Sequence, residues 1–120
     1  MVLLLALPLL AAVVSLSPAG IVADGRTVEP TGAALEAWER LPEDLSVERR
    51  MVVTYALALV NRVDYFWGGK SLVLGWDDRW GEMMEVTVEG DDTTGTERPY
   101  GLDCSGFVDW AFYNASGGSY

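Results

Sequence analysis

The sequence has no histidine and only one cysteine among its 120 residues. A single cysteine excludes a disulfide within the chain, so cysteine has no crosslinking role here. Without histidine, no imidazole of this chain is available as a general base for catalysis. Basic residues are also few, 8 against 18 acidic ones, and the formal net charge is −10. No stretch combines basic with aromatic residues, so nucleic acid is not expected as a partner.

The amino-terminal segment, residues 1–23, is strongly apolar. Apart from Pro8, residues 1–14 are all apolar, and no charged residue precedes Asp24. Two interpretations remain open, a secretory signal and the end of a membrane-spanning helix. We favour the membrane anchor, because no basic residues precede the apolar run. Both interpretations place residues 24–120 outside the cytoplasm. A free thiol in that environment indicates a chemical role for the cysteine.

Residues 24–45 are expected to form a linker followed by a short helix. Thr31 is a favourable N-cap, and Pro42 ends the helix after residue 41. Glu36 and Arg40 lie four residues apart, a spacing that brings the two side chains together on one helix face.

A longer helix is predicted over residues 47–63, with Ser46 as its N-cap. Apolar residues recur at helical spacing through this range, which makes it the strongest candidate for a core element. These residues are Met51, Val52, Tyr55, Ala56, Leu59, Val60 and Val63.

Residues 70–99 are rich in glycine, aspartate and threonine, and are expected to form an inserted loop or hairpin. Only residues 84–89 alternate as a strand does, with a turn at residues 90–92. The aspartates of this region are Asp77, Asp78, Asp91 and Asp92. Their spacing does not supply the alternating oxygen ligands and closing glutamate of a calcium loop, so solvated turns are favoured.

Cys104 lies in residues 101–108, which read Gly-Leu-Asp-Cys-Ser-Gly-Phe-Val. A turn leads there directly into a predicted helix with Asp103 as its N-cap. A thiol in the first turn faces unpaired backbone N–H groups and the positive end of the helix dipole, both of which favour the nucleophilic thiolate. The stripe expected to bury the opposite helix face is Phe107, Val108, Ala111, Phe112 and Ala115. A lone cysteine is more often a small buried hydrophobe, but this context favours an exposed nucleophile.

A second block, residues 65–69, reads Tyr-Phe-Trp-Gly-Gly and follows the 47–63 helix. The two blocks together, in this order and behind an export segment, resemble the NlpC-type cell-wall cysteine peptidases. The usual signature of that family is Tyr-x-Trp-Gly-Gly followed by Asp-Cys-Ser-Gly. The resemblance covers about residues 46–120. It implies an α+β, papain-like fold, truncated to the mainly helical amino-terminal half of the catalytic domain and preceded by the apolar segment.

The resemblance also implies roles for individual residues. Cys104 is the expected nucleophile, attacking the peptidoglycan stem-peptide bond between the γ-carboxyl of D-glutamate and a diamino acid. The Tyr65 hydroxyl is expected near the thiolate and the oxyanion, to which the Cys104 backbone N–H also donates. Asp103 and Ser105 are expected to receive the free amino end of the stem peptide. The expected floor of the cleft is Trp67, Gly68 and Gly69. Peptidoglycan stem peptides are the expected partner, and neither a metal nor a cofactor is expected.

The chain departs from the family pattern in two ways. The two blocks lie farther apart than in compact members, so residues 70–99 are expected to form an extra lobe near the cleft. The imidazole that a cysteine peptidase requires is also missing. In the family that histidine lies downstream, on a strand of the sheet that covers the cysteine helix, followed by a third polar residue. We therefore interpret the chain as the first half of a catalytic domain, expected to be inactive by itself.

Alternative functions remain open at this stage. Residues 17–21, Ser-Pro-Ala-Gly-Ile, resemble the corresponding part of wall hydrolases carried by conjugative mobile elements. A related papain-like amidase or acyltransferase would use the same cysteine helix. A non-catalytic wall-binding or scaffold domain would retain Cys104 only as a relic.

Overall fold

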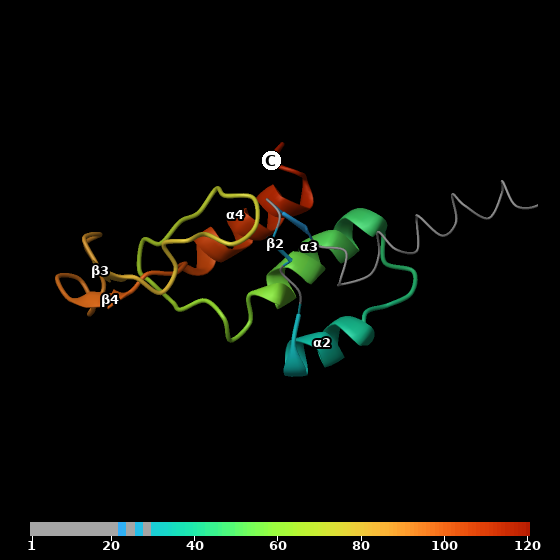
Figure 1. Cartoon of the computed structure of the whole chain (residues 1–120), viewed down its shortest axis with the longest axis horizontal. Coiled ribbons are helices and arrows are strands. Elements are labelled where there is room, and N and C mark those ends of the chain that lie inside the picture. The colour runs from blue at the N-terminus through green and yellow to red at the C-terminus, as the bar shows by residue number, and fades with distance from the viewer. Residues whose placement is uncertain (1–21, 24–25, 28–29) are drawn as a thin grey trace, which may run out of the picture.

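The computed structural model describes residues 22–23, 26–27 and 30–120 (Figure 1). These residues form a mixed α+β structure. The elements in chain order are β1 (Val22–Ala23), β2 (Arg26–Thr27), α2 (Gly32–Glu39), α3 (Val47–Ala58), β3 (Met83–Glu85), β4 (Glu97–Pro99) and α4 (Cys104–Ala115). The strands form two antiparallel pairs, β1 with β2 and β3 with β4.

The signal or anchor predicted for residues 1–23 falls almost entirely outside the described residues, since only residues 22 and 23 are included. In the described part of the chain, none of the helices has the length and apolar character that crossing a bilayer requires. The linker predicted over residues 24–30 contains β2, which pairs with β1 in the register Val22 to Thr27 and Ala23 to Arg26.

The first predicted helix is confirmed as α2, which follows Thr31 and ends at Glu39, two residues earlier than expected. Glu36 and Arg40 form the expected ion pair at 3.7 Å. Their side chains are 67% and 79% exposed, so the pair contributes little to stability. A hydrogen bond of 2.7 Å from the Trp38 indole N–H to the Thr54 hydroxyl attaches α2 to α3.

Helix α3 begins where the sequence predicts but ends five residues earlier. Ser46 caps it, because its hydroxyl accepts a hydrogen bond from the Arg49 N–H at 3.3 Å. The predicted end at Val63 is wrong, since the helix stops at Ala58. Asn61 has a φ of 61°, a left-handed conformation that asparagine tolerates better than most residues. This turn directs the chain away from the helix axis and toward α4.

The hydrophobic core lies between α3, α4 and residues 71–80, which follow the Gly68-Gly69 pair and Lys70. Its buried members are Tyr55, Ala58, Leu59, Trp80, Leu102, Trp110 and Ala111. Trp110 is fully buried and makes edge-to-face contacts with Tyr55 and Trp80, at centroid distances of 5.8 and 5.7 Å. Its indole N–H donates to the Gly75 carbonyl at 3.1 Å. This one side chain therefore joins all three parts of the core.

The region expected as an inserted loop consists of two different parts. Residues 71–80 pack against the helices, with Trp80 in the core and Trp76 beside it. Residues 83–99 form a hairpin at one end of the molecule (Figure 1), in which Met83 pairs with Pro99. The strand predicted over residues 84–89 is wrong in extent, because β3 ends at Glu85.

The turn of this hairpin is also wider than predicted. Beyond Glu85, the Val86 N–H donates to the Thr96 carbonyl at 2.9 Å, and the Gly95 N–H donates to the Val86 carbonyl at 2.8 Å. The turn therefore spans residues 87–94 instead of residues 90–92. Val86, at the turn end of the two strands, is 1% exposed, so this end of the hairpin is anchored by a buried side chain.

Helix α4 begins at Cys104 as predicted, and three of the five residues expected in its buried stripe, Phe107, Ala111 and Ala115, belong to the core or pack against it. Val108 and Phe112, expected in the buried stripe, are 48% and 41% exposed, and this part of the prediction is wrong. Trp110 and Asn114 are buried instead. Asn114 is buried because its side chain makes two hydrogen bonds there. Its amide oxygen accepts from the Gly75 N–H at 2.6 Å, and its nitrogen donates to the Val73 carbonyl at 3.0 Å. The asparagine side chain thus provides hydrogen-bond partners for backbone groups of the loop that covers the helix.

The carboxyl end of α4 has a glycine cap. Gly117 has a φ of 66°, and its N–H donates to the Asn114 carbonyl at 3.0 Å. The Gly118 N–H donates to the Tyr113 carbonyl at 2.8 Å. These two bonds form a Schellman motif, in which glycine avoids the steric cost of the left-handed conformation.

Candidate active site

The two sequence blocks, 65–69 and 101–108, are joined by backbone hydrogen bonds. The Leu102 N–H donates to the Asp64 carbonyl at 3.0 Å, and the Phe66 N–H donates to the Leu102 carbonyl at 3.1 Å, as in a short parallel bridge. The Asp103 N–H donates to the Gly69 carbonyl at 3.1 Å. Each block therefore fixes the position of the other, and together they hold the first turn of α4.

Three glycines permit this close approach of the two blocks. A Cβ at Gly101 would collide with the Asp64 carbonyl oxygen, and one at Gly69 with the Gly101 carbonyl oxygen. A Cβ at Gly106, inside α4, would collide with the Gly69 carbonyl oxygen. No residue with a Cβ fits at these positions without a shift of the backbone, because the obstructing atoms are backbone atoms that cannot rotate away.

Replacement of Gly106 by alanine is therefore expected to lower the free energy of unfolding by about 1–2 kcal/mol. Alanine in a helix interior normally stabilises by about 1 kcal/mol relative to glycine. Here the clash with the Gly69 carbonyl, of the size of other overpacking changes at about 1–3 kcal/mol, reverses the sign. Urea denaturation measures the effect. Val108→Ala, at an exposed position of the same helix, is the control and should stay within about 0.5 kcal/mol of wild type. A more stable Gly106→Ala protein would contradict the close approach.

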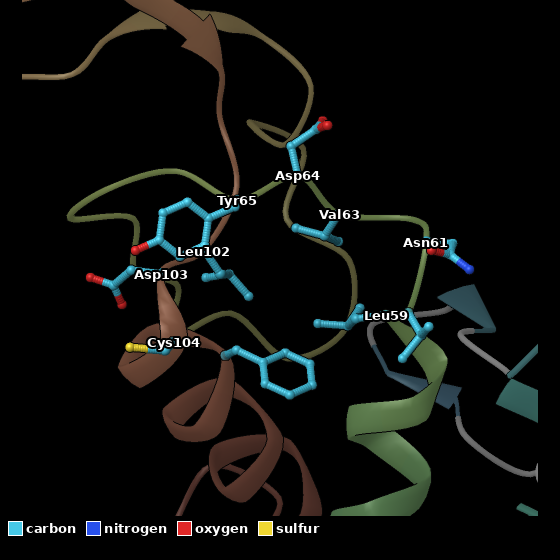
Figure 2. A pocket seen from close by; sticks show the side chains of 10 residues that line it. Leu59, Asn61, Val63, Asp64, Tyr65, Leu102, Asp103 and Cys104 are labelled. Atoms are coloured by element: carbon cyan, nitrogen blue, oxygen red, sulfur yellow. The ribbon is translucent and has the colours of Figure 1, made fainter. Parts of the chain in front are cut away.

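The Cys104 thiol is exposed at the amino end of α4, next to a pocket of about 270 Å³. Figure 2 shows the Cys104 sulfur, the Tyr65 hydroxyl and the Asp103 carboxylate directed to the same side of this pocket. The other residues that line it are Leu59, Val60, Asn61, Val63, Asp64, Leu102 and Phe107. The arrangement combines a nucleophile, a hydroxyl donor and a carboxylate above a largely apolar wall.

Tyr65 contributes its hydroxyl from an exposed position, since 60% of the residue is open to solvent. Partial desolvation raises the pKa of the Tyr65 hydroxyl, and the charges of Cys104, Asp91 and Asp103 raise it further, against a smaller opposite effect from Lys70. The hydroxyl consequently keeps its proton at neutral pH and can donate a hydrogen bond. Cys104 is the first residue of its helix, so no carbonyl of a preceding helical turn accepts a hydrogen bond from its backbone N–H.

Asp103 is the most strongly connected polar residue of the site. Its Oδ1 accepts hydrogen bonds from the Gly106 N–H at 2.7 Å, the Lys70 ammonium at 2.6 Å and the Ser105 hydroxyl at 3.0 Å. Burial by itself raises the pKa of the Asp103 carboxyl, but the hydrogen bonds from Lys70, Gly106 and Ser105 together outweigh it and leave the pKa below its ordinary value. Asp103 is thus a carboxylate at neutral pH and caps α4 at the same time.

The three residues expected as the floor of the cleft are placed differently from one another. The Trp67 indole N–H donates to the Glu89 carbonyl at 3.1 Å, and a Cβ at Gly68 would collide with Val88. Like Gly69, neither residue is among those that line the pocket beside Cys104. Both contact the turn of the hairpin instead, and only Gly69 touches the first turn of α4.

Lys70 is the site residue that the sequence reasoning did not identify. Its ammonium donates to both Asp103 and Ser105. One signal in the sequence could have pointed to it: it is the only lysine of the chain and directly follows the Gly68-Gly69 pair.

No family model, curated protein or solved structure matches this chain. Within the described residues, no three histidine, cysteine, aspartate or glutamate side chains come together as a group that could hold a metal ion.

Proposed function

We propose that Cys104 is the nucleophile of a papain-like, NlpC-type cysteine endopeptidase that cleaves peptidoglycan stem peptides outside the cytoplasm. One observation carries this proposal. The backbone pairing of two distant sequence blocks holds an exposed thiol at the start of a helix, beside the Tyr65 hydroxyl and the Asp103 carboxylate. A cysteine serving only as a small hydrophobe would be buried.

The proposed reaction is acyl transfer to sulfur. The Cys104 thiolate attacks the carbonyl carbon of the γ-D-glutamyl bond and forms a C–S bond, while the carbonyl oxygen takes the electron pair of its π bond. The Cys104 N–H and the Tyr65 hydroxyl donate to this oxyanion. Collapse breaks the C–N bond, and the diamino acid leaves as an amine after taking up a proton. Water then hydrolyses the thioester and releases the carboxylic acid together with the thiol.

The proton transfers of this reaction need a general base, which in cysteine peptidases is an imidazole. An imidazole supplied by other polypeptide fits this role in the proposal, since the sequence has no histidine. Asp103 and Ser105 form the proposed subsite for the amino end of the stem peptide. Both lie next to Cys104 in the chain, which sets the length of peptide between that subsite and the bond that is cleaved.

The proposal is tested with an electrophilic substrate analogue, because alkylation of sulfur needs no proton donor for a leaving amine. The probe is L-alanyl-γ-D-glutamate in which a chloromethyl group replaces the γ-carboxyl hydroxyl to give a chloromethyl ketone, made with a free and with an acetylated amino end. We expect it to label Cys104 at least about tenfold faster than the γ-L-glutamyl diastereomer, since a tenfold rate ratio needs only about 1.4 kcal/mol of discrimination. Mass spectrometry of the intact protein measures the rates.

Two variants serve as controls for the labelling experiment. Cys104→Ser should abolish labelling. Tyr65→Phe should slow the reaction with the D-glutamyl probe but leave the reaction with iodoacetamide unchanged, because Tyr65 is exposed and its ring is retained. Equal rates for the two diastereomers, with either amino end, would contradict a stem-peptide site.

A non-catalytic wall-binding domain is the second candidate, favoured by the absence of histidine. In that case Cys104→Ser should bind purified peptidoglycan as tightly as wild type, and the thiol should react with both diastereomers at the same rate. Sedimentation of the protein with insoluble peptidoglycan measures the binding.

A further inference from the structure

Lys70 places a positive charge in the subsite proposed for the amino end of the substrate. Its ammonium nitrogen lies 2.6 Å from Asp103 Oδ1 and also hydrogen-bonds to the Ser105 hydroxyl. The Lys70 side chain is 52% exposed, whereas that of Asp103 is 11% exposed. The ammonium thus approaches a mostly covered carboxylate from the solvent side, the side from which a peptide would also arrive.

The backbone of Lys70 is held in this position from two directions. The Tyr100 hydroxyl donates to the Lys70 carbonyl at 2.8 Å and accepts from the Lys70 N–H at 3.3 Å. The Arg79 guanidinium also donates to the Lys70 carbonyl, at 3.3 Å. Because the Lys70 backbone is fixed, much of the conformational entropy that is lost when the ammonium binds Asp103 has already been lost on folding. A free amine from solution has no such advantage.

We propose that Lys70 is a specificity-determining residue that directs the site toward stem peptides whose amino end is acylated, and away from peptides with a free ammonium group. This inference rests on the proposed function. An incoming ammonium would have to displace Lys70 or lie beside it, where like charges repel. An acylated end brings an uncharged N–H for Asp103 and a carbonyl oxygen that accepts from the Lys70 ammonium. Stem peptides have such an end while an amide still joins them to the glycan strand.

The test measures the binding of two peptides by isothermal titration calorimetry: L-alanyl-γ-D-glutamate with a free amino end, and the same peptide acetylated. Wild type is expected to bind the acetylated peptide about fivefold more tightly. Lys70→Met keeps most of the apolar stem but leaves the Asp103 carboxylate without its cation, so it should prefer the free amine by a similar factor. Lys70→Arg keeps the charge and should retain the wild-type preference.

Arg98→Met provides the matched control. It removes the same charge from an exposed position on β4, where the Arg98 guanidinium contacts Thr96, and should leave the wild-type preference unchanged. If wild type prefers the free amine as strongly as Lys70→Met does, Lys70 leaves the subsite on binding and this inference alone is overturned. If no variant binds either peptide, the proposed stem-peptide site is overturned, and the inference with it.

Discussion

Replacement of Trp110 by alanine is expected to lower the free energy of unfolding by about 3–5 kcal/mol. The indole is fully buried and contacts Tyr55 on α3 and Trp80 on the covering segment, while its N–H bonds to the Gly75 carbonyl. Alanine leaves a cavity where these three parts meet and an unpaired buried carbonyl. Since small domains are stable by about 5–15 kcal/mol, much of the protein should be unfolded without denaturant at elevated temperature. Urea denaturation followed by far-ultraviolet circular dichroism measures the loss.

Trp67→Ala is the matched control for this change. The Trp67 indole is only half-buried and makes one hydrogen bond, to the Glu89 carbonyl in the hairpin turn. Its removal should cost about 1–2 kcal/mol. Equal losses for the two tryptophans would show that Trp110 does not hold the core together.

Replacement of Asp103 by alanine should lower the free energy of unfolding by about 2–3 kcal/mol. The change removes the N-cap of α4, leaves the buried Gly106 N–H without its acceptor and deprives Lys70 of its ion-pair partner. Asp103→Asn separates these effects, because its side-chain oxygen can still accept from the Gly106 N–H while the charge is lost. We expect asparagine to cost about 1 kcal/mol. Chemical denaturation of the three proteins at pH 7 measures the difference.

The stability gap between wild type and Asp103→Asn should also depend on pH. The pKa of the Asp103 carboxyl is lower in the folded protein than its ordinary value of 3.8. The carboxylate therefore contributes its full stabilisation above the pKa of the unfolded chain, and loses it as the pH falls through the folded pKa. The gap should be constant above about pH 5 and shrink below about pH 4. A gap that widens as the pH falls would contradict the ion pair with Lys70.

The starts of α3 and α4 were predictable from this sequence, whereas the end of α3 was not. Ser46 and Asp103 cap α3 and α4 through hydrogen bonds to N–H groups three residues later, so the signal and its effect are local. The helical spacing of apolar residues continues past Ala58, where α3 ends. The chain leaves the helix there because residues 64 and 66 must reach Leu102, a contact that no local pattern contains.

The candidate site shows the same division. The pattern of residue types identified Cys104, Tyr65 and Asp103, and the structure places all three at one pocket. The same pattern missed Lys70, because its contact with Asp103 spans 33 residues and depends on the turn at the preceding glycine pair. It also placed Trp67 in the cleft, whereas the hairpin turn holds that ring elsewhere.

The sequence by itself determined where α3 and α4 begin, because each start depends on interactions within one turn of backbone. Only the tertiary structure decided that α4 buries Trp110 and Asn114, and which cation meets Asp103. The physical reason is that Asn114 and Lys70 satisfy partners 41 and 33 residues away, and such pairings exist only after the chain has folded back on itself.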